Sequence, residues 1–137
     1  MTNNNKARVL VVDDEPVVRM AYTRSLGAEF EPHTVSDGEE ALRAMERTPA
    51  DIVLLDLRLP GAQGLEVLEA MKRKWPETEV VVITGYPSVD SAKQAVRLGA
   101  ADYLAKPVGT DEVMSAARNA LTRKLWTLRI QPERSIS

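Results

Sequence analysis

Five side chains that could take part in chemistry stand directly after apolar segments of the sequence. The stretch VLVVDDEP places Asp13 and Asp14 after a run of aliphatic residues, and Asp56, Thr84 and Lys106 follow three further runs. Carboxylates that gather at one point repel each other and raise each other's pKa unless a cation neutralises them. If these segments end side by side, the pattern predicts a site that binds a cation.

The residue types of this cluster favour magnesium. A few oxygen ligands, with space for water and a phosphate, suit Mg²⁺ better than calcium, whereas zinc favours His or Cys, and the chain has one His and no Cys. Asp56 stands alone at its segment end, before the loop LRLPGAQG. A carboxylate can attack a phosphoryl group and form an acyl phosphate. We predict Asp56 as this nucleophile, with the Lys106 ammonium and the Thr84 hydroxyl assisting it.

The surrounding segments must hold these groups together. Apolar runs typical of strands cover residues 8–12, 30–35, 51–55, 79–83 and 103–105, and they alternate with segments of helical period. Three of the runs are continuously apolar, which indicates strands covered by helices on both faces. We therefore predict the α/β class, with a doubly wound, five-stranded parallel sheet of the flavodoxin-like (βα)5 type. A strand order of 2-1-3-4-5 would bring the three aspartates together at the topological switch point.

Capping residues and apolar periodicity predict the helices between the strands. They are expected from Pro16 to the stop at Gly27, from a capping box of Ser36 and Glu39 to Thr48, from Gly64 to Trp75, from the cap Ser88 to Gly99, and from Thr110 to about Trp126. Val17 and four methionines, Met20, Met45, Met71 and Met114, are expected on the core faces of these helices. The single histidine, His33, is interpreted as structural or exposed.

Length and composition restrict the class of protein. The chain has 137 residues, 44% hydrophobic and 28% charged, which is typical of one globular domain, and no apolar run reaches membrane-spanning length. We expect a disordered lead at 1–6, one domain at 7–126, and a C-terminal tail or the start of a linker at 127–137. The polar start and the absence of cysteine favour a cytoplasmic protein. A formal charge of −2 with mixed signs does not favour direct binding of nucleic acid.

Taken together, the motifs resemble the receiver domain of two-component response regulators over residues 7–125. The acidic DDE, the segment DLRLPGAQG that begins at Asp56, and the stretches TGYP and GAADYLAKP correspond to that family in order. The resemblance implies that Asp56 accepts a phosphoryl group from a sensor histidine kinase, a histidine phosphotransferase or a small acyl phosphate. It implies that Asp14, Asp56 and the backbone carbonyl of Arg58 bind Mg²⁺ directly, that Asp13 acts through water, and that a cis bond before Pro107 aims the Lys106 ammonium.

The resemblance also implies a conformational switch. Thr84 and Tyr103 match the hydroxyl and the aromatic residue that respond to phosphorylation, and together they would remodel the face formed by the helix after Ser88, the strand 103–105 and the helix after Thr110. This face could bind partners or a second copy of the chain. Arg58 and Tyr86 stand two positions after Asp56 and Thr84, and we hypothesise that they shield the acyl phosphate and prolong its lifetime.

Other functions remain alternatives. An Mg²⁺-dependent aspartyl-nucleophile phosphohydrolase would usually carry an acid two residues after its nucleophile, where this chain has Arg58. A flavin phosphate binder would need a Ser, Thr and Gly-rich loop where this chain has DDEP. A receiver-like scaffold that is never phosphorylated is disfavoured, because Asp13, Asp14, Asp56, Thr84 and Lys106 are all present.

The stretch AVRLGAADYLAKP is similar to receivers attached to ATPase-type transcription activators. Met114, Leu121 and Leu128 form a stripe that is either a short coiled coil or dimer seam, or a frayed amphipathic end.

Overall fold

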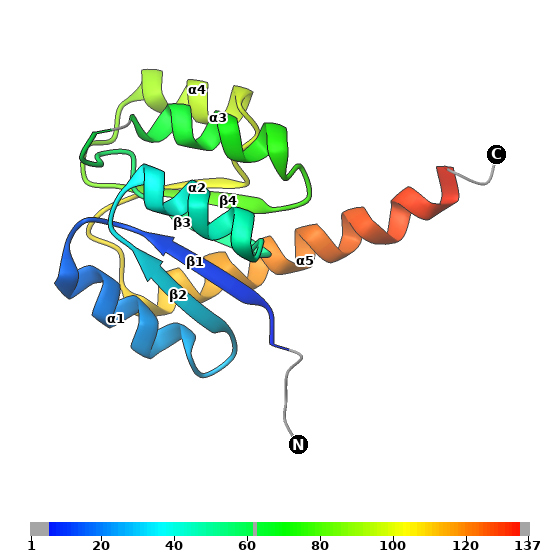
Figure 1. Ribbon diagram of the computed structural model, residues 1–137, viewed down its shortest axis with the longest axis horizontal. Helices are drawn as coiled ribbons and strands as arrows, with labels where there is room; N and C mark the ends of the chain where they lie inside the picture. The colour runs from blue at the N-terminus through cyan, green and yellow to red at the C-terminus, as the bar shows by residue number, and fades with distance from the viewer. Residues whose placement is uncertain (1–5, 62, 135–137) are drawn as a thin grey trace.

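The computed structural model describes residues 6–61 and 63–134, and in these residues five strands alternate with five helices (Figure 1). The strands are β1 (Arg8–Val12), β2 (Glu31–Val35), β3 (Ile52–Leu55), β4 (Glu79–Thr84) and β5 (Asp102–Ala105). They form one sheet in the order β2-β1-β3-β4-β5, and every neighbouring pair is parallel. The predicted doubly wound α/β fold and its strand order are confirmed.

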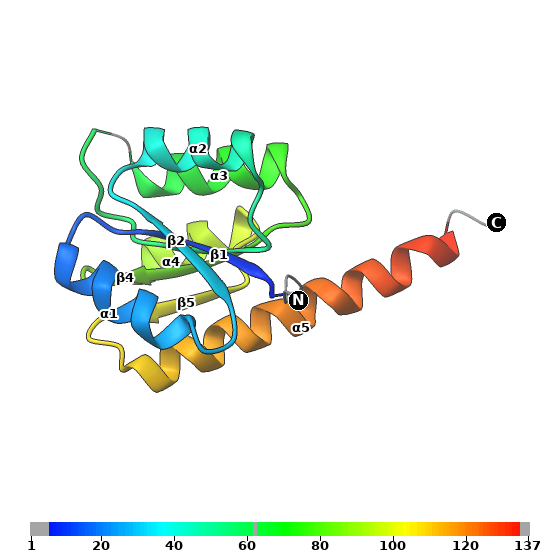
Figure 2. The ribbon, with the colours of Figure 1, turned by 60° about the horizontal axis from the view of Figure 1, so that its bottom comes forward.

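The helices lie on both faces of this sheet. They are α1 (Pro16–Leu26), α2 (Gly38–Arg47), α3 (Gly64–Lys74), α4 (Val89–Arg97) and α5 (Thr110–Arg134). Helices α1 and α5 cover one face, and α2, α3 and α4 cover the other (Figures 1 and 2). Side chains alternate along a strand, so Val9 and Val11 face α1 and α5, whereas Leu10 and Val12 face the opposite helices. Burial on both faces explains the continuously apolar runs.

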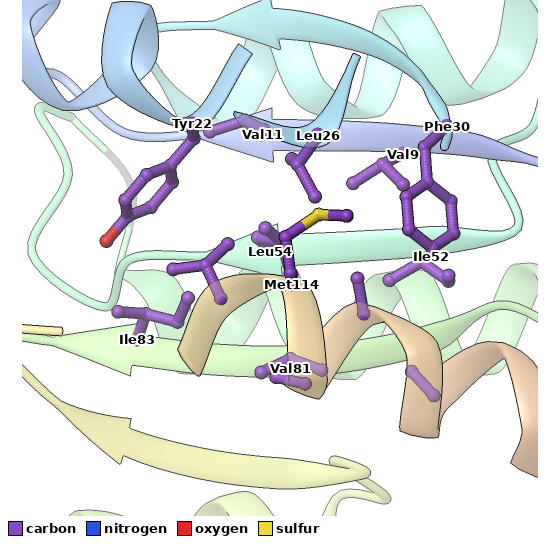
Figure 3. Packing of buried hydrophobic residues seen from close by; sticks show 14 residues of the cluster. Val9, Val11, Tyr22, Leu26, Phe30, Ile52, Leu54, Val81, Ile83 and Met114 are labelled. Atoms are coloured by element: carbon purple, nitrogen blue, oxygen red, sulfur yellow. The ribbon is translucent and has the colours of Figure 1, made fainter. Parts of the chain in front are cut away.

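The core beneath α1 and α5 is shown in Figure 3, where Tyr22, Leu26 and Met114 lie against aliphatic residues of the central strands. Leu26 is completely buried, and burial of a leucine contributes roughly 2 kcal/mol. The buried residues of α1 are Tyr22 and Leu26, four positions apart, and Val18 one turn earlier is partly buried on the same core. This spacing keeps one helix stripe against the sheet.

The predicted core face of α1 was partly wrong. Val17 and Met20 are 77% and 64% exposed. The core stripe is centred on Val18 and Tyr22, and this places both residues on the solvent side of the helix. The other three methionines, Met45, Met71 and Met114, are buried as predicted, and His33 is exposed.

The observed cap of α2 differs from the predicted one, whereas the observed cap of α4 agrees with the prediction. Helix α2 is capped by Asp37, whose side chain accepts from the Glu40 N–H at 2.8 Å, so the predicted Ser36 and Glu39 box was wrong by one residue. Aspartate caps a helix as well as serine does, and the Glu40 side chain returns to accept from the Ser36 N–H at 2.9 Å. Helix α4 begins after Ser88 as predicted, and Ser88 Oγ accepts from the Ser91 N–H at 3.0 Å.

Helix α5 is longer than predicted, because it ends at Arg134 rather than near Trp126. No glycine or proline lies between Thr110 and Gln131 to stop it. Its last part extends away from the sheet (Figures 1 and 2). Lys124 Nζ lies 2.7 Å from Asp51 Oδ1, which fixes the helix beside the start of β3. Of the expected lead and tail, residues 1–5 and 135–137 lie outside the described residues. In the part of the chain that the structure describes, no helix combines the length and the hydropathy that a membrane span requires.

Candidate functional site

The three aspartates meet at the carboxyl edge of the sheet. Asp13 and Asp14 follow β1 and Asp56 follows β3, and these neighbouring strands end together because Val12 pairs with Leu55. One carboxylate oxygen of each aspartate lies within 4.8 Å of the others. Asp13 and Asp56 are 3% and 6% exposed, whereas Asp14 is exposed. The predicted convergence of these side chains is therefore observed.

Lys106 reaches this cluster from β5, which lies two strands away from β3. Its Nζ lies 2.8 Å from Asp13 Oδ2 and 3.0 Å from Asp56 Oδ2, and its side chain is 17% exposed. The Lys106-Pro107 peptide bond is cis, in agreement with the resemblance. The ammonium thus lies between the two buried carboxylates and offsets part of their repulsion.

The loop backbone fixes how these two carboxylates are oriented. Asp13 Oδ1 accepts from the Glu15 N–H at 2.9 Å, and Asp56 Oδ1 accepts from the Arg58 N–H at 2.9 Å. In both aspartates, the second oxygen, Oδ2, accepts from Lys106. Each carboxylate is therefore held by one backbone N–H and one ammonium, which leaves little rotational freedom.

The surroundings of Asp56 and Lys106 raise the pKa values of both residues. Burial raises the pKa of Asp56 and nearby Asp13 adds to this, while the Arg58 N–H and Lys106 oppose it. Burial lowers the pKa of Lys106, but the hydrogen bonds and charges of Asp13 and Asp56 outweigh it, so the pKa lies above its usual value. Lys106 is therefore positively charged at neutral pH.

An open cavity of about 720 Å³ adjoins the cluster. Asp14, Asp56 and Lys106 line it together with residues of the loops after β3 and β4. At its rim, the Arg58 guanidinium carbon lies 3.9 Å from the centre of the Tyr86 ring, a cation–π contact. The cavity gives molecules from solvent access to the Asp56 carboxylate.

The donors in the cluster fit a magnesium ion. They are three carboxylates with neither His nor Cys among them, and hard oxygen donors in small number are those that Mg²⁺ prefers. Asp14 is exposed, so it can bind an ion that keeps several water molecules. The acidic site is therefore consistent with Mg²⁺.

Thr84 and Tyr103 lie near this edge but not among the residues that line the cavity. Thr84 is completely buried, and its Oγ1 accepts from the Tyr86 N–H at 3.1 Å. The Tyr103 hydroxyl lies 2.5 Å from Ser91 Oγ. Within the described residues, neither hydroxyl makes a hydrogen bond to Asp56.

Two residues that touch the site were missed by the sequence reasoning. Glu15 Oε1 lies 3.4 Å from Lys106 Nζ, and Arg19 Nη1 donates to the Asp13 carbonyl oxygen at 2.7 Å. The position of Glu15 beside the acidic pair could have suggested its role. Arg19 reaches back from the first turn of α1, and no spacing in the sequence distinguishes it from a surface arginine.

Comparisons with known proteins agree with this geometry. A family model described as the response regulator receiver domain matches residues 9–118. The response regulator protein PilR of Pseudomonas aeruginosa is 35% identical over 118 residues, which are 85% of this chain and 26% of PilR. The regulatory protein AtoC of Escherichia coli K12 is 36% identical over 115 residues, 83% of this chain and 25% of AtoC. The chain thus spans about a quarter of the length of these curated relatives.

Solved structures match as well. A crystal structure of NtrX from Brucella abortus has a TM-score of 0.87 at 33% identity, and the match covers 93% of this chain and 30% of that one. The separate receiver domain of the same NtrX has a TM-score of 0.78 at 35% identity and covers 83% and 98% of the two chains. With its five-stranded fold, its acidic pocket and a family match over most of its length, this chain belongs to the response regulator receiver domain family of two-component signalling.

Proposed function

We propose that this domain accepts a phosphoryl group on Asp56 and passes the signal on through contacts with partner proteins. The observation that carries the proposal is the position of Asp56, a buried carboxylate that lines an open cavity beside two further aspartates and the Lys106 ammonium. Family membership supports the same role. The donor would be the phosphohistidine of a sensor histidine kinase or of a histidine phosphotransferase.

In the transfer step, an oxygen of the Asp56 carboxylate attacks phosphorus and forms a P–O bond. The P–N bond of the phosphohistidine breaks, and the imidazole leaves with the bonding electron pair and takes a proton from water. Lys106 stabilises the negative charge on the transferred oxygens, because its ammonium already lies 3.0 Å from Asp56. Asp14, Asp56 and the Arg58 carbonyl would hold Mg²⁺ directly and Asp13 through water, and the bound ion would supply further positive charge to these oxygens.

The phosphoaspartate would then change the surface formed by α4, β5 and α5. Thr84 and Tyr103 would move together, with Thr84 drawn toward the new oxygens and the Tyr103 ring turning inward. Two exposed apolar residues of α4, Val89 and Val96, support this surface as a docking site for a partner or for a second copy of the chain.

Phosphohydrolase activity is the weaker alternative. Enzymes of that kind would use an acid two residues after the nucleophile, and the side chain at this position is the Arg58 guanidinium, which stacks on Tyr86. A phosphoacceptor domain needs no acid there, since its product is the acyl phosphate itself.

The direct test is intact mass spectrometry after incubation with Mg²⁺ and acetyl phosphate. The wild type should gain one phosphoryl group, and Asp56→Asn should gain none. Asp111→Asn is the matched control, because Asp111 is an exposed aspartate in the first turn of α5. Equal modification of the wild type and Asp56→Asn would show that Asp56 is not the acceptor.

A further inference from the structure

The first turn of α4 is held more by hydroxyl groups than by apolar packing. Ala95 is the buried residue of this helix, while Val89 and Val96 are 74% and 69% exposed. By contrast, helix α3 on the same face buries Val67, Leu68 and Met71. Because α4 gains little from apolar burial, each polar contact at its start has a larger share in its position.

Three hydroxyl groups form the contacts at this point. Ser91 Oγ lies 2.5 Å from the Tyr103 hydroxyl and 3.0 Å from Ser88 Oγ, and it donates to the Ser88 carbonyl at 3.3 Å. The Tyr103 hydroxyl also accepts from the Ser88 N–H at 3.3 Å. The protons can be assigned without conflict: the Tyr103 hydroxyl accepts from the Ser88 N–H and donates to Ser91 Oγ, and Ser91 Oγ donates to the Ser88 carbonyl.

We infer that Ser91 is the positioning residue that fixes the orientation of Tyr103 and joins it to the first turn of α4. A half-buried tyrosine keeps its hydroxyl bonded, and Ser91 is its nearest partner. If the Tyr103 ring turns, the Ser88 N–H at the start of α4 loses its acceptor. Movement of the ring and movement of the helix start are then one event.

The same contacts reach the phosphoryl site through a short loop. Thr84 Oγ1 accepts from the Tyr86 N–H, and the Tyr103 hydroxyl accepts from the Ser88 N–H two residues later. One loop after β4 is therefore held at two N–H groups by two side-chain hydroxyls. A change at Thr84 loosens the first of these contacts, and Ser91 determines whether the second follows. This regulatory consequence rests on the proposed function, whereas the contacts themselves do not.

The test uses amide hydrogen exchange in the unphosphorylated protein, with Ser91→Ala, Tyr103→Phe and the double variant. Each single variant should lower the protection of the amides in the first turn of α4 about fivefold, the effect of one hydrogen bond of about 1 kcal/mol. The double variant should lose no more amide protection than the single variant with the larger loss. Ser91→Thr, which keeps a hydroxyl, should restore protection. Ser115→Ala, an exposed serine of α5, controls for the change in helix propensity and should leave α4 unchanged.

Losses that add in the double variant would overturn the inference, because Ser91 and Tyr103 would then act independently. Unchanged protection in Ser91→Ala would overturn it as well. A second experiment adds Mg²⁺ and acetyl phosphate and follows the NMR signals of the Tyr103 ring and of α4. In the wild type, the signals of the Tyr103 ring and of α4 should change at the same degree of phosphorylation. In Ser91→Ala, the two sets of signals should change independently of each other. If intact mass shows no phosphoryl gain, the proposed function fails, while the exchange experiment still decides the role of Ser91.

Discussion

The Lys106 ammonium lies 3.0 Å from Asp56 Oδ2, although the two residues are 50 positions apart in the sequence. The same ammonium lies 2.8 Å from Asp13 Oδ2, so one cation pairs with two buried carboxylates and offsets part of their charge. Lys106 thereby stabilises the folded site. Under the proposed function it would also place positive charge beside the transferred oxygens.

Lys106→Gln should lower the free energy of unfolding by about 2 kcal/mol in the absence of Mg²⁺, because two buried carboxylates lose a charged hydrogen-bond donor. Added Mg²⁺ should recover part of this loss. Urea unfolding measures both effects, and Lys93→Gln, an exposed lysine of α4, is the control. A loss that is unaffected by Mg²⁺ would contradict the shared role of the lysine and the metal ion.

Mg²⁺ should raise the melting temperature of the wild type, since an ion that binds only the folded state stabilises it by about 2.7 kcal/mol at a hundredfold excess over its dissociation constant. Asp14→Asn should weaken this response strongly and should change the melting temperature little without Mg²⁺, because Asp14 is exposed. Thermal unfolding across a Mg²⁺ titration measures both the melting temperature without Mg²⁺ and its rise when Mg²⁺ is added. If Asp14→Asn and Asp111→Asn respond to Mg²⁺ alike, Asp14 is not a ligand.

Removal of the Arg58 and Tyr86 side chains should shorten the lifetime of the acyl phosphate. Their stacked contact at 3.9 Å covers part of the cavity rim, so Arg58→Ala, Tyr86→Ala should admit water to phosphorylated Asp56 and speed dephosphorylation by several-fold. Loss of the phosphoryl group is followed by intact mass after the donor has been removed. Arg24→Ala, an exposed arginine of α1, is the control. Dephosphorylation no faster than in the wild type would count against shielding.

Gly64→Ala should destabilise the domain by about 3 kcal/mol. A Cβ at Gly64 would stand 2.4 Å from the Leu57 Cα, which is backbone and cannot turn aside. Because Leu57 follows Asp56 directly, the shift should also slow phosphorylation. Gly109→Ala is the matched control, since its Cβ would meet only the Glu112 side chain at 3.8 Å. Similar unfolding curves for the two variants would refute the close approach.

The Asp51 and Lys124 pair should contribute to stability only above acidic pH. Burial raises the pKa of Asp51, but the Lys124 hydrogen bond and the Arg8 N–H outweigh it and lower the pKa overall. The folded state therefore holds this proton less tightly than the unfolded state, so the contribution is present above about pH 4 and is lost as the pH falls through the folded-state pKa.

Lys124→Gln should accordingly cost about 0.5–1 kcal/mol at pH 7, as expected for a partly exposed pair, and almost nothing near the acid limit of folding. Urea unfolding at a series of pH values measures the difference from the wild type. A cost that stays constant with pH would assign the effect to lost packing of the lysine stem.

The amino-acid sequence by itself determined the architecture and the members of the acidic cluster. The apolar runs of β1, β3 and β4 indicated burial between two helix layers, and parallel strands end at one edge, so the polar residues after the strands were expected there and the strand order 2-1-3-4-5 was expected to bring the aspartates together. The position of Asp13, Asp14, Asp56 and Lys106 followed from these two facts. The cap at Ser88 and the helix start at Pro16 were equally local, because both depend on the backbone of a few neighbouring residues.

The tertiary structure alone decided the contacts between distant segments. Helical periodicity gives the width of an apolar stripe but not its centre, so Met20 was predicted in the core and lies on the surface. The hydroxyl contact of Ser91 with Tyr103 and the pairing of Lys124 with Asp51 join residues whose local sequence carries no sign of each other. Such contacts exist only after the strands have assembled, because packing of the sheet and helices sets which side chains come within hydrogen-bonding distance.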